Sequence, residues 1–162
     1  MRTELKSGLA AYLGSLSGDG LPRTLTDLIA FNRAHADVEM ALFGQDVFEA
    51  AEQTGVGDPA YLEARATARR LAGPEGLDRL FASGLAALAA PTREPAGPIT
   101  APRGGPVNTA CLPAVAGYPH ITMPMGHIGG LPVGLSFIGP AWSEARLLSL
   151  AFAYEQRRGA NF

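Results

Sequence analysis

Cysteine and histidine are the residue types from which a nucleophile and its base are most often built, and the sequence offers one such pairing. Cys111, the only cysteine, precedes His120 across a segment with two prolines. A thiolate activated by a nearby imidazole is one interpretation. The other is a small buried cysteine beside a histidine at a strand end, which we favour because free cysteine is among the most buried residue types. We therefore expect the Cys111 thiol to be buried and unreactive.

Other chemistry has weaker support in the sequence. No serine lies in a nucleophile-elbow motif, and Ser136 is expected to hydrogen-bond a neighbour on the Gly134 side of its strand. The histidines lack metal-ligand spacing, so we predict no metal site. No glycine pair is followed by the lysine of a phosphate-binding loop, so nucleotide binding is not supported and no cofactor is expected. The serines and histidines considered are Ser7, Ser15, Ser17, Ser83, Ser136, Ser143, Ser149, His35, His120 and His127.

Composition sets the class of protein. Apolar residues make up 47% of the 162 residues and charged residues 17%, which is typical of a globular domain with a real core. The net charge of -2 gives no basic surface, so nucleic acid is not an expected partner. No apolar run reaches membrane-spanning length, and the N-terminal residues do not resemble a signal peptide. We expect a cytoplasmic protein without a membrane partner.

Helical spacing dominates the first half of the chain. Apolar residues recur at helical intervals over 5–16, and Thr24 with Asp27 resembles a capping box for a helix over 24–39. Asp58-Pro59 is typical of a helix start, and that helix is expected to end near Gly73-Pro74. A short helix follows around 77–81. The last helix begins after Ser143, carries Arg157 and Arg158 at its end and closes at Gly159.

Strand signals lie between these helices. The run LAALAA at 85–90 favours a strand buried on both faces, although a buried helix end is the competing interpretation. The Pro- and Gly-rich segment 91–106 predicts a long loop. Residues 121–125 and 133–138 alternate like two strands joined by GHIGG, and Gly134 indicates a bulge or a close backbone approach. Helices, strands and a final helix predict an α/β fold.

One tract resembles a known family. The motif Pro-Ala-x-x-Gly-x-Pro at 113–119 precedes a strand ending in Pro-x-Gly and then Gly-Leu-Pro-x-Gly-x-x-x-x-Gly at 130–139. A helix with an acid, a Leu-Leu pair and a closing Glu follows. These features resemble the C-terminal end of amidase-signature enzymes, and residues 24–52 are similar to the peptide-amidase branch. The matching residues are Pro113, Ala114, Gly117, Pro119, Pro124, Gly126, Gly130, Leu131, Pro132, Gly134, Gly139, Glu144, Leu147, Leu148 and Glu155.

The resemblance covers only the C-terminal portion of such an enzyme. Family members hydrolyse amides with a Ser–cis-Ser–Lys triad, and none of its motifs occurs here. Lys6, the only lysine, has no match to the catalytic strand, so we carry over no catalytic residue. The Pro-rich loop would lie near the substrate entrance, and the resemblance implies weak substrate-binding candidates. These are Thr92, Asn108, Thr109 and Cys111.

These observations give one set of expectations. The fold is α/β, the C-terminal part of the amidase-signature fold with a short mixed sheet flanked by helices. Residues 1–162 form a single unit, mainly helical over 1–84, with strands and the loop over 85–139 and the last helix over 140–162. The chain is expected to be a segment of a hydrolase acting on small-molecule amides, inactive alone. The alternative is a non-catalytic module that binds a partner or self-associates, and we expect a homo-oligomer.

Overall fold

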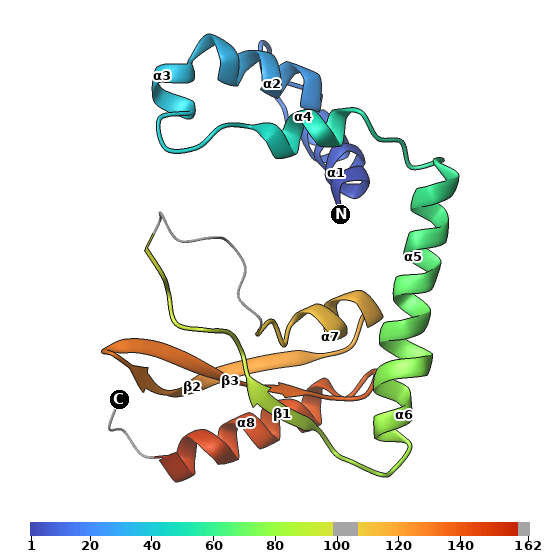
Figure 1. Cartoon of the computed structure of the whole chain (residues 1–162), viewed down its shortest axis with the longest axis vertical. Helices are drawn as coiled ribbons and strands as arrows, with labels where there is room; N and C mark the ends of the chain where they lie inside the picture. The colour runs from blue at the N-terminus through green and yellow to red at the C-terminus, as the bar shows by residue number, and fades with distance from the viewer. Residues whose placement is uncertain (99–106, 159–162) are drawn as a thin grey trace. The chain divides into compact units, whose positions relative to one another are not determined.

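The computed structural model describes residues 1–98 and 107–158. The chain forms two compact units, Met1–Arg65 and Ala66–Phe162, each with its own internal packing (Figure 1). Gly159, where we expected the last helix to close, and half of the Pro-rich loop, 99–106, lie outside the described residues. Within the described part, no helix has the length and apolar character needed to cross a bilayer.

The first unit is a small helical cluster. Its core is formed by Leu25, Ile29 and Ala51, with Leu5, Leu9 and Phe48 packed around them. Ala51 is fully buried, so a larger side chain there would have to displace the facing helices. The elements are α1 (Arg2–Ser15), α2 (Leu25–Ala34), α3 (Ala36–Glu39) and α4 (Asp46–Glu52), and α5 (Pro59–Ala72) continues into the second unit.

The capping box at the start of α2 is confirmed. The Thr24 hydroxyl accepts the Asp27 backbone N–H at 3.1 Å, and the Asp27 carboxylate accepts the Thr24 backbone N–H at 2.9 Å. Backbone N–H groups of Arg23 and Thr24, with the Thr24 hydroxyl, hold the pKa of Asp27 below its usual value. The helix predicted over 24–39 is interrupted at His35, where α2 ends and α3 begins. Helix α4 was not predicted from the sequence.

The second unit is built on a three-stranded sheet. The strand order is β1-β3-β2 and both pairs are antiparallel, so the predicted short sheet flanked by helices is present without the parallel pairing of a mixed sheet. Helix α5 ends at Ala72, as predicted from Gly73-Pro74. The chain then forms a π-helical turn, because Pro74 has no N–H with which to continue the α-helical hydrogen bonds. The remaining elements are η1 (Gly73–Leu77), α6 (Asp78–Phe81), β1 (Leu88–Pro91), α7 (Cys111–Ala116), β2 (His120–Ile128), β3 (Leu131–Ile138) and α8 (Glu144–Arg158).

Strands β2 and β3 form the predicted hairpin. Gly129 and Gly130 both have positive φ, 58° and 81°, which a two-residue hairpin turn of the mirror-image type requires. The register shifts between Pro124 and Gly126, which marks a bulge.

The prediction for β1 was wrong in one respect. Its Ala89 and Pro91 are exposed, because β1 is an edge strand and not a central one.

The two faces of the sheet differ in character. The Phe137 ring meets the Tyr154 ring of α8 edge-on at 6.1 Å, so the face that carries Met123 and Phe137 is the one that α8 covers (Figure 1). Leu147 and Ala151 are the buried residues of α8. Side chains alternate along a strand. The opposite face therefore carries the small and polar residues of the hairpin, His120, Thr122, Gly134 and Ser136.

Replacing Thr24 with alanine should lower the free energy of unfolding by about 1 kcal/mol, because the Asp27 N–H loses its capping acceptor. Urea titration followed by circular dichroism measures the change. Thr26→Ala is the matched control, because Thr26 is an exposed residue of the same helix. This change should lower the free energy of unfolding by less than about 0.5 kcal/mol. An equal loss in both variants would contradict the capping assignment.

Replacing Gly134 with alanine should destabilise the sheet by about 1–3 kcal/mol, the usual cost of overpacking. A Cβ at this position would lie 2.6 Å from the Thr122 hydroxyl oxygen and 2.7 Å from that of Thr92. Gly8→Ala is the control, since a Cβ at Gly8 meets nothing within 4 Å. In helix α1 that change should stabilise the chain by up to about 1 kcal/mol. Thermal unfolding of the two variants should therefore shift in opposite directions.

Candidate functional site

Four polar side chains form a continuous chain of hydrogen bonds on the sheet face that α8 does not cover. His120 Nε2 lies 2.6 Å from Ser136 Oγ, and Ser136 Oγ lies 2.8 Å from Thr92 Oγ1. Thr92 Oγ1 in turn lies 2.6 Å from Thr122 Oγ1. Strand β2 supplies both ends of this network, β3 supplies Ser136, and Thr92 follows β1. The network therefore links β2, β3 and the residue that follows β1 through side chains.

A serine within hydrogen-bonding distance of an imidazole has the geometry of a nucleophile and its base. Ser136, however, has 0% exposure, so no substrate can reach its hydroxyl. Its role is to satisfy its neighbours, and the predicted hydrogen bond of Ser136 is confirmed. When His120 Nε2 accepts, each hydroxyl can donate to the next in one direction, from Thr122 through Thr92 and Ser136 to the imidazole. The arrangement is a positioning network.

Gly134 makes this network possible. The space that a Cβ would fill is occupied by the hydroxyls of Thr122 and Thr92. The close backbone approach predicted from a glycine inside a strand is therefore confirmed, and side-chain oxygens are the groups that approach.

The predicted site residues lie in two neighbouring stretches of chain, 91–94 and 107–111. The Thr109 N–H donates to the Thr92 carbonyl at 3.2 Å, and the Thr109 hydroxyl donates to the Pro91 carbonyl at 2.6 Å. Asn108 lies opposite Arg93 in an antiparallel bridge. The Cys111 N–H donates to the Asn108 carbonyl at 3.2 Å, so main-chain hydrogen bonds join the four candidates in two pairs, Thr92 with Thr109 and Asn108 with Cys111.

Our prediction that the Cys111 thiol is buried was wrong. Cys111 is exposed, because it is the first residue of α7 and follows a turn instead of lying in a strand. The proposed imidazole partner is also engaged elsewhere, since His120 Nε2 contacts Ser136. An exposed thiol therefore lies beside the candidate segment without the geometry of a Cys–His pair.

An acidic side chain also holds residues 107–111, the candidate segment. The Val107 N–H donates to Glu94 Oε1 at 2.7 Å. This backbone hydrogen bond is the main reason that the pKa of Glu94 lies below its usual value. Among the described residues, no group of three or more His, Cys, Asp or Glu side chains could hold a metal ion.

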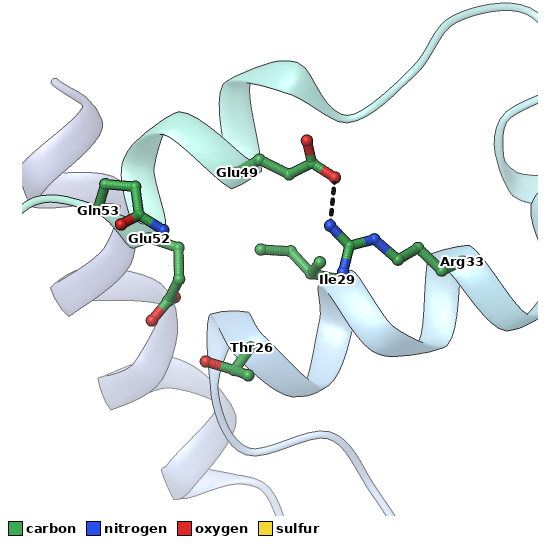
Figure 2. Close-up of a pocket in the computed structure, with 6 residues that line it drawn as sticks. All are labelled: Thr26, Ile29, Arg33, Glu49, Glu52 and Gln53. Atoms are coloured by element: carbon green, nitrogen blue, oxygen red, sulfur yellow. Dashed lines mark hydrogen bonds and ion pairs between the residues drawn. The ribbon is translucent and has the colours of Figure 1, made fainter.

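The first unit contains a small pocket of about 180 Å³, lined by residues of α2 and α4 and by Gln53, which directly follows α4 (Figure 2). Arg33 pairs with Glu49 at 2.7 Å. Lys6 of α1 pairs with the Glu52 carboxylate at 3.1 Å and donates to the Glu52 carbonyl at 2.6 Å. Each acid at this pocket is therefore balanced by a cation, which leaves no net charge to select a ligand.

Sequence reasoning missed the combination of His120, Thr122 and Ser136. The alternation of residues along each strand was a usable signal. His120 and Thr122 are two apart in one strand, and Gly134 and Ser136 are two apart in the next, so each pair shares a face of its strand. What the alternation could not give was the hairpin register, which places Thr122 directly opposite Ser136.

Comparisons with known proteins relate the chain to amidases. No family model matches the sequence. A probable amidase of Arabidopsis thaliana is 35% identical over 156 residues, which cover 94% of this chain and 27% of the relative. The crystal structure of the peptide amidase from Stenotrophomonas maltophilia is 52% identical with a TM-score of 0.84, over 96% of this chain and 32% of that one. An amidase family protein from Bacillus anthracis is 27% identical with a TM-score of 0.78.

The chain thus spans between 27% and 32% of the length of these proteins, while nearly all of it aligns with them. The agreement extends through both units, since the peptide amidase covers 96% of the chain. The chain belongs to the amidase signature family and corresponds to the C-terminal portion of its members.

Proposed function

We propose that the chain is the C-terminal part of an enzyme that hydrolyses amide C–N bonds, and that it has no amidase activity by itself. The observation that carries this proposal is the 52% identity and TM-score of 0.84 to a peptide amidase over nearly the whole chain but only 32% of that enzyme. The two units would then belong to one amidase domain. Such an enzyme would act on small-molecule amides in the cytoplasm, without nucleic acid or membrane partners.

The inactivity has a physical reason. Amide hydrolysis needs an accessible activated nucleophile and hydrogen-bond donors for the oxyanion. Ser136, which has an imidazole partner, is completely buried, and the exposed Cys111 lacks that partner. In this proposal the segment contributes sheet strands and the candidate substrate residues of 107–111, while the catalytic groups come from the part of the enzyme outside this chain.

Self-association is a second candidate role, and helix α8 supplies a specific observation for it. Leu147 and Ala151 are buried, yet Leu148 and Phe152 on another side are 60% and 63% exposed. Trp142, just before the helix, is 92% exposed. A helix that is apolar on two sides is usually packed on both, and exposed apolar clusters favour association. We propose that the isolated chain forms a homo-oligomer through this surface.

The proposed amidase role predicts two results. The purified chain should release no ammonia from a peptide amide, because it lacks an accessible nucleophile with a base. A chimera in which this chain replaces the aligned third of the Stenotrophomonas maltophilia peptide amidase should be active, because the exchanged parts are 52% identical and share one backbone arrangement with a TM-score of 0.84. The controls are the unmodified enzyme and the enzyme truncated before the segment. Turnover by the chain alone would overturn the inactivity, and a folded but inactive chimera would count against the amidase assignment.

The proposed association predicts that the chain sediments as a dimer or larger species at micromolar concentration. Replacing both Leu148 and Phe152 with glutamate should shift it to monomer, since charges on an interface core oppose burial. Arg146→Glu, an exposed change on the same helix, is the control and should leave the sedimentation coefficient unchanged. A monomeric parent chain with cooperative unfolding would contradict the proposal.

A further inference from the structure

Thr92 connects more elements than any other residue of the polar network. Its N–H donates to the Gly134 carbonyl of β3 at 2.7 Å, and its carbonyl accepts the Thr109 N–H at 3.2 Å. Its hydroxyl contacts Thr122 of β2 and Ser136 of β3. Every hydrogen-bonding group of this residue therefore has a partner, and the partners lie on two strands and on the candidate segment.

The segment 107–110 precedes α7 and belongs to no strand of the sheet. Among the described residues, its hydrogen bonds run to residues 91–94 and to α7. Those to 91–94 include the Thr109 hydroxyl to the Pro91 carbonyl and the Val107 N–H to the Glu94 carboxylate. The Cys111 N–H of α7 donates to the Asn108 carbonyl, so the stretch that follows β1 and the first turn of α7 together hold Asn108 and Thr109.

That stretch is weakly tied to the sheet by its backbone alone. Residue 91 is a proline, which has no N–H to donate to the ladder. Beyond it, the Thr92 N–H to Gly134 is the backbone bond that continues the pairing. The Thr92 hydroxyl adds two side-chain bonds, one of them to the fully buried Ser136. Because Ser136 is held by His120 as well, Thr92 is anchored to a fixed point.

We propose that Thr92 is a positioning residue that fixes the 107–111 segment for contact with the amide substrate, and this rests on the proposed amidase function. The group it presents is the exposed Asn108, whose carboxamide offers one acceptor and two donors that complement an amide carbonyl and nitrogen. Thr92 does not touch the substrate itself, since its hydroxyl is used inside the network. It acts through the hydrogen bond from Thr109.

The first experiment tests the positioning on the chain as it is. Hydrogen exchange of the Thr109 amide is measured by NMR in the parent chain, in Thr92→Val and in Thr92→Ser. Valine keeps the shape and loses the hydroxyl, so exchange of Thr109 should become about tenfold faster, the effect of one or two lost hydrogen bonds. Serine keeps the hydroxyl and should restore the parent rate. The Asp27 amide of the first unit should be unchanged in both variants.

Thr122→Val is a second variant, which removes one partner of Thr92 at an exposed position and should give a smaller acceleration. An unchanged Thr109 rate in both valine variants would overturn the positioning role. The same rate in the serine and valine variants of Thr92 would also overturn it, because the hydroxyl would then be irrelevant.

The second experiment tests the link to substrate in the chimeric enzyme. Thr92→Val should raise KM for a peptide amide about tenfold with little change in kcat, because binding is loosened while the catalytic groups are untouched. Thr92→Ser should restore KM. An unchanged KM beside a faster Thr109 exchange would overturn the substrate role. An inactive parent chimera would instead count against the proposed function, and the exchange data alone would then decide whether Thr92 positions the segment.

Discussion

Ser136 is completely buried, and a buried hydroxyl without a partner costs about 1–3 kcal/mol. Much of the second unit can be understood from this constraint. Strand β3 is central, so Ser136 has β2 on one side and β1 with the chain that follows it on the other. His120 and Thr92 meet it from these two sides at 2.6 and 2.8 Å. The Ser136 hydroxyl thus favours one register of each neighbouring strand. A slip of one residue would turn His120 or Thr92 to the other face and leave the hydroxyl without that partner.

The hydrogen bonding around Ser136 also explains why residue 134 of this sheet face is a glycine. Thr92 and Thr122 can share a hydrogen bond across β3 only if the residue between them has no side chain, and a Cβ there would come within 2.7 Å of both oxygens. On the other face, Met123 is buried and the Phe137 ring packs edge-on against Tyr154 of α8. Apolar burial therefore stabilises one side of the sheet, and a directional network fixes the geometry of the other.

Local signals in the sequence were sufficient for elements whose cause is local. The Thr24–Asp27 box, the end of α5 at Gly73-Pro74 and the hairpin at Gly129-Gly130 each depend on residues within a few positions. Helices α4 and α7 were missed because they are short, and their stability comes from packing more than from capping or periodicity. The prediction that Cys111 is buried failed for a related reason. The general preference of cysteine for buried positions says nothing about the first turn of a short helix.

The candidate site shows where sequence reasoning ends. The resemblance indicates Thr92, Asn108, Thr109 and Cys111, and main-chain hydrogen bonds join them in two pairs, Thr92 with Thr109 and Asn108 with Cys111. The sequence did not indicate this pairing. Thr92 was expected from the resemblance to bind substrate, and that expectation stays a prediction. Its hydroxyl contacts Thr122 and Ser136, which the sequence did not indicate. A polar residue beside a site can serve it by holding the residues that touch the ligand. Under the proposed function, Thr92 would have this role for the 107–111 segment, because its carbonyl accepts the Thr109 N–H and its hydroxyl is held by Thr122 and Ser136.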